Sequence, residues 1–228
     1  MMLLENGDGP ILIIAPHPDD ETLGAGGLLL RARAMGRAIH WLIVTGITTE
    51  QGWPTEKVAR REAEIDRVAK TFDFATVHRL NLPAAKLETL PLGEIIGGIG
   101  KVVHAVQPEM ILIPHRGDAH SDHQVVYAAA TACAKWFRYP SVRLTLVYET
   151  LSETDSGLFS SDPFLPNVFV DISEQLEGKL RIATMFNDEI GEFPFPRSLD
   201  AIRALAMTRG AASGNHAAEA FMLLRGRF

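Results

Sequence analysis

The chain has 228 residues, of which 46% are hydrophobic and 22% are charged, and its formal net charge is −6. This balance is typical of a soluble globular protein and excludes an intrinsically disordered chain, which would combine few apolar residues with a large net charge. Lysine and arginine form no cluster, which argues against a nucleic-acid partner or an anionic membrane surface.

The sequence also indicates a compartment. No apolar run approaches the roughly 20 residues that span a bilayer, and residues 1–7 lack the basic and long apolar segments of a signal peptide. The single cysteine, Cys133, excludes an internal disulfide and a cysteine-rich zinc module. We therefore expect a cytoplasmic protein without membrane insertion. No heptad pattern indicates an oligomeric state, and a homo-oligomer is compatible with the sequence.

Short apolar runs typical of buried strands alternate with longer runs of helical periodicity. Up to Glu149 the predicted elements are, in chain order, a strand over 11–14, a helix over 23–35, a strand over 39–45, a helix over 55–72, a strand over 76–80, a helix over 92–106, a strand over 110–114, a helix over 121–137 and a strand over 142–148. This alternation predicts an α/β fold in three layers, with a Rossmann-like, mostly parallel sheet and helices on both faces.

After Glu149 the pattern is looser. The predicted elements are a loop over 151–166, a strand over 168–172, a helix over 174–186, a turn over 193–196 and a helix over 198–208. Long loops such as 151–166 are common places for substrate contacts. Because no repeat or linker interrupts the chain, we interpret residues 1–228 as a single domain with a C-terminal extension.

Two polar segments follow predicted strands, at the strand ends where ligands gather in open α/β sheets. The first is Ala15-Pro16-His17-Pro18-Asp19-Asp20-Glu21-Thr22, and the second is Pro114-His115-Arg116-Gly117-Asp118-Ala119-His120-Ser121-Asp122-His123. Neither has the composition of a routine connection. If the two strands are neighbours in the sheet, both segments face the same crevice.

The spacing within these segments is typical of a catalytic zinc site, which takes about three protein ligands and leaves one position for water. His17 and Asp20 are three residues apart before a helix, so both can point at one ion. His120 and His123 share a helix face at the same spacing, and either of them would complete the ligand set. Asp19 would then be a free carboxylate beside activated water, suited to act as a general base.

The alternative interpretation is structural. Histidines and aspartates before a helix can cap it and form turn hydrogen bonds without binding a metal. One such segment would leave the two interpretations balanced. Two segments at matching strand ends favour the metal site.

The first segment, extended to Gly27, resembles the signature of the PIG-L/LmbE-like family of zinc-dependent N-deacetylases, and His120-Ser121-Asp122-His123 resembles the second motif of that family. The family includes deacetylases of N-acetylglucosaminyl conjugates. Weaker similarities occur at Arg61-x-x-Glu64, Tyr148-Glu149, Pro166–Asp171, Arg209-Gly210 and Ala218–Phe221. The resemblance therefore covers most of the chain.

Roles for individual residues follow from this resemblance. The implied zinc ligands are His17, Asp20 and His123. Asp19 matches the general base of the family, and His120 matches the histidine that stabilises the oxyanion or donates a proton. Asp122 matches the carboxylate that tunes His120, and a hydrogen bond between them would favour the imidazolium form. Arg61 falls where the family places a substrate-binding arginine. Glu149, at the end of a strand, is a second candidate for substrate contact.

These observations predict a zinc-dependent hydrolase that removes the N-acetyl group from an N-acetylglucosamine-type amino sugar or its conjugate, giving acetate and a free amine. Zinc would lower the pKa of water and polarise the carbonyl, and other divalent metals also suit two histidines and one aspartate. One alternative is an amidase of the same family that cuts a different amide. The other is a non-catalytic Rossmann-like module that binds a nucleotide or a sugar.

Several residues keep more than one interpretation. The register of Arg60 and Arg61 is open, as is the contribution of His115 or His216 to the site. Gly24-x-Gly26-Gly27 lacks the last glycine of a dinucleotide-binding fingerprint, so we attribute these glycines to close helix–sheet packing. Arg209 and Glu219 are candidates for a structural ion pair.

Overall fold

The computed structural model describes residues 7–157 and 162–228. Within these residues, seven strands form one sheet in the order β3-β2-β1-β4-β5-β7-β6. The strands are β1 (Ile11–Ala15), β2 (Ile39–Gly46), β3 (Thr76–Pro83), β4 (Met110–Ile113), β5 (Leu144–Tyr148), β6 (Val168–Asp171) and β7 (Ala218–Gly226). Strands β1 to β5 are parallel, and β7 is antiparallel to both of its neighbours.

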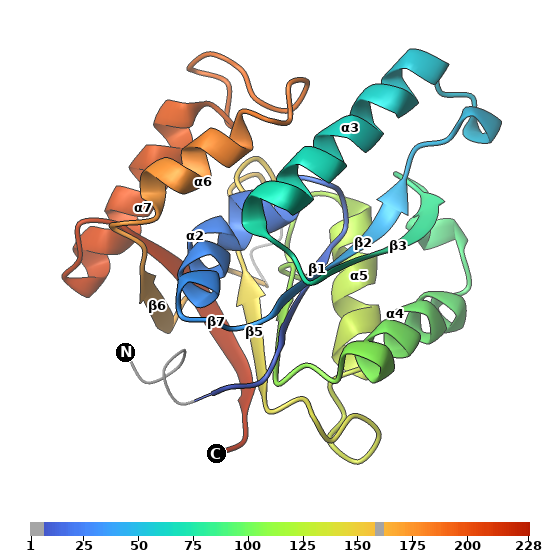
Figure 1. Ribbon diagram of the computed structural model, residues 1–228, viewed down its shortest axis with the longest axis horizontal. Coiled ribbons are helices and arrows are strands. Elements are labelled where there is room, and N and C mark those ends of the chain that lie inside the picture. The colour runs from blue at the N-terminus through green and yellow to red at the C-terminus, as the bar shows by residue number, and fades with distance from the viewer. Residues whose placement is uncertain (1–6, 158–161) are drawn as a thin grey trace.

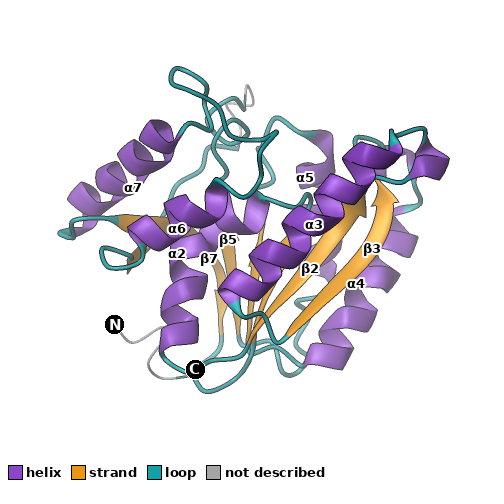
Figure 2. Cartoon of the chain, turned by 45° about the horizontal axis from the view of Figure 1, so that its top comes forward, coloured by secondary structure: helices purple, strands orange, loops and turns teal. Residues whose placement is uncertain are grey.

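Helices cover both faces of this sheet (Figure 1, Figure 2). One face packs against α2 (Asp20–Ala34), α3 (Thr55–Phe72), α6 (Leu176–Ala183) and α7 (Leu199–Ser213). The other packs against α4 (Leu92–Val106) and α5 (Ser121–Ala132), and short 3-10 turns occur at η1 (Thr49–Gln51) and η2 (Leu87–Thr89). None of the helices in the described part of the chain is long and apolar enough to cross a membrane.

The central strand β1 shows why the sequence folds into three layers. All five of its residues are buried. Ile11 and Ile13 pack on the α2 side, and Leu12 and Ile14 pack on the α4 and α5 side. A parallel strand covered on both faces must be apolar at every position rather than at alternate ones. The predicted mostly parallel α/β sheet with helices on both faces is confirmed.

The C-terminal strand β7 is absent from the sequence-based prediction. Its alanines, Glu219, Met222 and leucines favour helices in isolation. In the fold this segment pairs with β5 on one edge and with β6 on the other, so backbone hydrogen bonds on both sides decide its conformation. The C-terminal extension therefore completes the sheet.

Helix α5 is shorter than predicted. It ends at Ala132 rather than at residue 137, because the backbone amides of Cys133 and Ala134 donate to carbonyls three residues back and tighten the last turn. Trp136 and Phe137, which extended the apolar pattern, are 57% and 63% exposed and lie outside the core. Helix α6 is likewise shorter than the predicted range.

Helix α2 packs closely against its neighbours. A Cβ atom added at Gly24 would lie 2.3 Å from Cδ2 of Tyr148 on β5, and one added at Gly27 would lie 2.5 Å from Cγ2 of Ile172. Real side chains do not approach so closely, so only glycine fits at these positions. Gly24 thus packs closely on the sheet as predicted, whereas Gly27 packs against Ile172 just after β6 and Gly26 against Lys179 of α6.

Helix α2 is also kinked, at Ala25 (φ −144°, ψ 16°). A kink interrupts the regular hydrogen bonds of a helix and leaves backbone amides that need other partners. Here the amides of Gly27 and Leu28 donate to the two carboxylate oxygens of Glu219, at 2.8 and 2.7 Å. Strand β7 thus supplies the acceptors that the kinked helix lacks.

A buried lysine completes this arrangement. The Nζ atom of Lys179 donates to the carbonyl of Leu23 (2.8 Å) and to Glu219 (2.7 Å). The expected ion pair between Arg209 and Glu219 is wrong. Arg209 instead donates two hydrogen bonds to Glu149, at 2.8 and 2.6 Å, because Glu219 already faces Lys179 and the α2 amides.

Replacing Glu219 by alanine would leave two buried α2 amides without their acceptor and the buried Lys179 ammonium without its counter-charge. We expect the free energy of unfolding to fall by about 3–5 kcal/mol, as when one partner of a buried ion pair is removed. Urea titration followed by circular dichroism measures this loss. The matched control is Glu177→Ala, whose exposed pair with Arg203 should contribute far less to stability because solvent screens it. Equal losses in the two variants would contradict the role of Glu219.

Candidate metal centre and catalytic residues

The two polar segments meet at one edge of the sheet. Strands β1 and β4 are adjacent and parallel, with Ile13 opposite Leu112, so the segments that leave their carboxyl ends converge. The Nε2 atom of His17 lies 3.0 Å from Oδ2 of Asp122, although 105 positions separate them in the chain. The expectation that both segments face one crevice is confirmed.

Three of the predicted site residues form a compact set of ligand atoms. His17, Asp20 and His123 each place one donor atom within 4.8 Å of the others. The Oδ2 atom of Asp20 is 3.3 Å from Nε2 of His123 and 3.4 Å from Nδ1 of His17. Two imidazoles and one carboxylate are a donor set that suits a catalytic zinc ion.

A buried carboxylate stands behind each histidine of this set. Asp122 accepts from His17 at Nε2, and Asp118 lies 2.8 Å from Nδ1 of His123. Each carboxylate engages the ring nitrogen that points away from Asp20, so the other nitrogen is directed toward it. Carboxylates in this position fix the tautomer and orientation of histidines that bind metals.

The geometry of Asp122 differs from the sequence-based expectation. Its carboxylate binds His17 and accepts the backbone amides of Ala85 (2.7 Å) and Leu87 (3.1 Å). Its own backbone amide donates to Nδ1 of His120 (3.1 Å). Burial and the neighbouring His17 lower the pKa of His120. The expected hydrogen bond from a His120 imidazolium to the Asp122 carboxylate is not found among the described contacts.

The grouping of charges suits a cation. Burial by itself would lower the pKa of His17, but hydrogen bonds to Asp122 and Asp20 raise it to about 9. Burial likewise opposes the charge on His123, yet Asp20 and Asp118 raise its pKa to about 10. The surrounding carboxylates thus stabilise positive charge at both rings. A divalent cation bound by the ring nitrogens that face Asp20 would balance the negative charge of the carboxylates in place of the protons on those nitrogens.

Asp19 is held in an unusual conformation next to this set. Its backbone has φ 143° and ψ −29°, in a region that non-glycine residues rarely adopt. The Asp19 amide donates to the buried carboxylate of Glu21 (3.0 Å), and its own carboxylate accepts from Arg197 (2.8 Å). Burial and the nearby Asp20 raise the pKa of Asp19 to about 7, against the opposing effect of Arg197.

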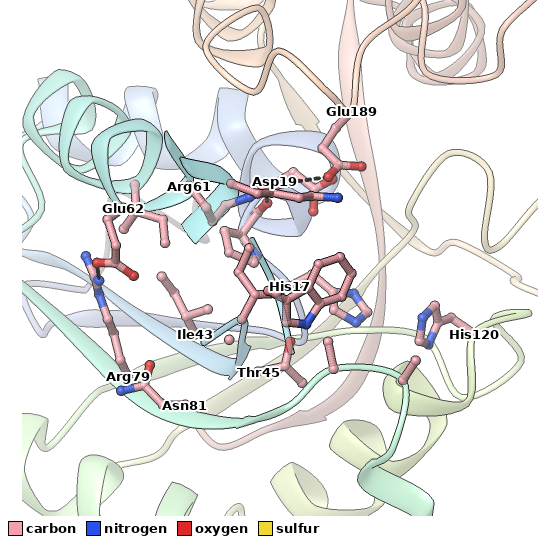
Figure 3. A pocket seen from close by; sticks show the side chains of 18 of the residues that line it. His17, Asp19, Ile43, Thr45, Arg61, Glu62, Arg79, Asn81, His120 and Glu189 are labelled. Atoms are coloured by element: carbon pink, nitrogen blue, oxygen red, sulfur yellow. Dashed lines mark hydrogen bonds and ion pairs between the residues drawn. The ribbon is translucent and has the colours of Figure 1, made fainter. Parts of the chain in front are cut away.

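A pocket of about 290 Å³ opens beside these residues. His17, Asp19 and His120 line it, and in Figure 3 His120 and Arg79 lie at opposite ends, with Asp19 and Glu189 along one side. The rest of the lining is divided about evenly between polar or charged side chains, such as Lys57, Arg61, Glu62, Asn81 and Arg197, and apolar ones, such as Trp53. The reactive groups therefore face a small cavity with both charged and apolar walls.

The structure separates Arg61 from Arg60. Arg61 lines the pocket, donates to the carbonyl of Pro18 (3.2 Å) and pairs with Glu189. Arg60 is exposed and pairs with Asp188 at 2.6 Å. Only Arg61 is thus placed to contact a ligand in this pocket.

The other candidates lie apart from the pocket lining. Glu149 is held by both hydrogen bonds from Arg209, and its contact with substrate stays a prediction. His115 is buried and lies 2.9 Å from the carbonyl of Asp162. His216 borders a separate surface hollow at the C-terminal end of α2, together with Arg31 and Asp171.

Sequence reasoning missed three residues of the site. Asp118 lies inside the second polar segment, so its position between a strand and two histidines was a usable signal. Arg197 and Glu189 come from the connection between α6 and α7 and line the pocket. No local pattern marks them, because only the folded chain brings this connection beside Asp19.

A comparison with known protein families matches the part of the chain that contains the two polar segments. The family model described as PIG-L: GlcNAc-PI de-N-acetylase matches residues 12–134. This range includes both polar segments, from β1 to the end of α5.

The chain is also similar to characterised proteins along most of its length. It is 25% identical to the diacetylchitobiose deacetylase of Thermococcus kodakarensis, over 96% of this chain and 84% of the relative. It is 26% identical to the 2'-N-acetylparomamine deacetylase of Streptomyces fradiae, over 92% of this chain and 85% of the relative. The fold matches that of N,N'-diacetylchitobiose deacetylase from Pyrococcus horikoshii with a TM-score of 0.77 and 22% identity, covering 98% of this chain and 89% of that one.

The strained backbone of Asp19 makes a testable prediction. Asp19→Gly and Asp19→Ala both remove the carboxylate, but only glycine tolerates this φ without steric cost. After the greater flexibility of unfolded glycine is allowed for, we expect Asp19→Gly to be more stable than Asp19→Ala by about 1 kcal/mol. Urea unfolding of chelator-treated protein measures the difference. The same pair at exposed Asp188 should show no advantage for glycine, and a more stable Asp19→Ala would contradict the strain.

Proposed function

Because the chain belongs to the PIG-L family, we propose that it is a metal-dependent hydrolase that removes the acetyl group from an N-acetylated amino sugar. The products are acetate and a free amine. The position of Asp19 carries this proposal. Its buried carboxylate lines the same pocket as His17 and His120 and directly precedes Asp20 in the chain, so a proton acceptor lies beside the candidate metal ligands.

We propose zinc as the metal and His17, Asp20 and His123 as its ligands. Zinc sites with three protein ligands keep a position for water or substrate. A zinc ion held here would supply Lewis acidity, which activates water and polarises the acetamide carbonyl. Asp118 and Asp122 orient the two histidines from behind.

Two side chains then divide the proton chemistry. Asp19 accepts the proton of the attacking water and later returns it to the leaving amine. His120 accepts a hydrogen bond at Nδ1 from the Asp122 amide, so a neutral ring carries its proton on Nε2. This N–H stabilises the oxyanion that develops as water adds to the carbonyl. Asp122 acts on His17 and on the position of His120 rather than by charging His120.

The pocket suits a small substrate that has both polar groups and apolar faces. Its volume of about 290 Å³ is at the lower end for small-molecule sites. Arg61 and Asn81 offer hydrogen-bond donors, and the indole of Trp53 offers a flat apolar surface. Sugars present both hydroxyl groups and apolar ring faces, and two similar enzymes are named for amino-sugar substrates. An amino sugar or its conjugate is therefore the proposed substrate class, with Arg61 as a binding residue.

The chemistry of the chain also fits the cytoplasmic location that we propose. Cys133 is a buried, free thiol. The proposed zinc ligands are histidines and aspartate, so the site needs no oxidising or thiol-rich environment. No contact proposed for function involves a nucleic acid.

The activity predicts acetate release from N-acetylglucosamine and its β-1,4-linked dimer. We expect release to stop with a zinc chelator and to return when zinc is restored, because a zinc ion bound at this site would supply the Lewis acidity that the hydrolysis needs. Asp19→Asn should lower kcat by about 100-fold or more while zinc content stays at one per chain. Zinc analysis by mass spectrometry and an acetate assay measure both quantities.

The controls separate the alternatives. Glu177→Ala, far from the pocket, should keep full activity. Hydrolysis of other amides but not of N-acetyl sugars would indicate an amidase with a different substrate. Sugar binding without turnover, or activity that survives complete removal of metal, would contradict the proposed hydrolase.

The carboxylate behind His123 makes a separate prediction. Asp118→Ala should weaken zinc binding by about 10- to 100-fold, as expected when the carboxylate that orients a metal-binding histidine is lost. Competition with a coloured chelator measures the affinity without any substrate. Asp188→Ala, which removes an exposed carboxylate, is the control. Unchanged affinity in Asp118→Ala would argue against His123 as a ligand.

A further inference from the structure

The guanidinium of Arg197 is the centre of a network at the pocket wall. Its Nη1 donates to Asp19 (2.8 Å) and Glu189 (3.3 Å), its Nε to the hydroxyl of Ser152 (2.7 Å), and its Nη2 to Glu153 (3.1 Å). These partners come from three separate segments of the chain. We propose that Arg197 is a positioning residue that holds the Asp19 carboxylate in place for proton transfer, an inference that rests on the proposed hydrolase function.

The contacts fix the guanidinium in one orientation. Each of its three nitrogens has a partner, and the side chain is only 18% exposed. A planar guanidinium bound on several sides cannot rotate without breaking several hydrogen bonds at once. An exposed ion pair between flexible side chains would lack this rigidity.

Asp19 depends on this contact. Among the described residues, Arg197 is the only side chain that donates a hydrogen bond to the Asp19 carboxylate. The Asp19 backbone is held separately, through the hydrogen bond from its amide to Glu21. The Arg197 contact therefore selects the direction of the carboxylate, and a proton acceptor that is misplaced by about 1 Å can lose about 100-fold in rate.

The loop after β5 supports both halves of the site. Ser152 and Glu153 hold Arg197, and the next residue, Thr154, donates to Asp118 (2.6 Å). Asp118 in turn orients His123. Three consecutive side chains thus connect the proton acceptor and a metal ligand to one segment.

Arg197 also belongs to a row of alternating charges. Glu189 pairs with Arg61 and with Arg197, and Arg197 pairs with Asp19. All four side chains line the pocket, and Figure 3 shows Asp19, Arg61 and Glu189 close together along one side of it. The positive charge of Arg197 is therefore balanced by Asp19, Glu189 and Glu153, which favours a positioning role over the binding of an anionic substrate group.

The test compares Arg197→Ala and Arg197→Lys with the wild type at equal zinc content. We expect Arg197→Ala to lower kcat by about 100-fold with little change in KM, because substrate contacts remain. Lysine should recover part of kcat. Added guanidinium ions should restore activity to Arg197→Ala in a saturable way, since they can fill the vacated space from the pocket. The control is Arg203→Met, in the first turns of α7, where Arg203 forms an exposed pair with Glu177.

Other results of this experiment would contradict the positioning role of Arg197. A rise in KM alone would make Arg197 a substrate-binding residue. A lower melting temperature with unchanged kcat per folded molecule, and no guanidinium rescue, would make it merely structural. If the wild type is active and Arg197→Ala is equally active, the inference fails alone. If the wild type hydrolyses no N-acetyl sugar, the proposed function fails and this inference with it.

Discussion

Strands β1 and β4 run parallel as neighbours, and the segments that leave them place Asp20, Asp118 and Asp122 around two histidines. Carboxylates buried at this depth are costly unless positive charge compensates them. His17 and His123 supply that charge as protonated rings or as ligands of a divalent cation. The candidate metal site therefore depends on the order of the strands, because these charged groups meet only if β1 and β4 are adjacent.

The carboxylates beside the two histidines are themselves held in place by hydrogen bonds. Asp122 is fixed by the backbone amides of Ala85 and Leu87, and Asp118 is fixed by Thr154. Each carboxylate is thus immobile before it orients a ring. Preorganisation of this kind matters in a hydrolase, since ligands that need not reorganise during the reaction lower its barrier.

The C-terminal part of the chain supports helix α2 and the residues around Asp19. Strand β7 carries Glu219, which together with Lys179 satisfies the backbone groups freed by the kink in α2. Helix α2 begins at Asp20, so the support of the kink also steadies the first polar segment. The connection before α7 supplies Arg197, which donates a hydrogen bond to the Asp19 carboxylate. The N-terminal half therefore holds the candidate ligands, and the C-terminal half holds their neighbours in place.

The alternation of strands and helices, the two polar segments, and His17, Asp20 and one of His120 and His123 as candidate ligands could all be predicted from the sequence, and the choice of His123 came from the family resemblance. These features are local: apolar runs report burial on both faces of a strand, and residues three apart before a helix share a direction. Tertiary structure decided that β7 is a strand, that Asp122 faces His17 rather than His120, and that Arg197 reaches Asp19 across 178 positions. Such choices depend on partners brought close only by folding, and local propensity and spacing contain no information about which distant group will satisfy a buried charge.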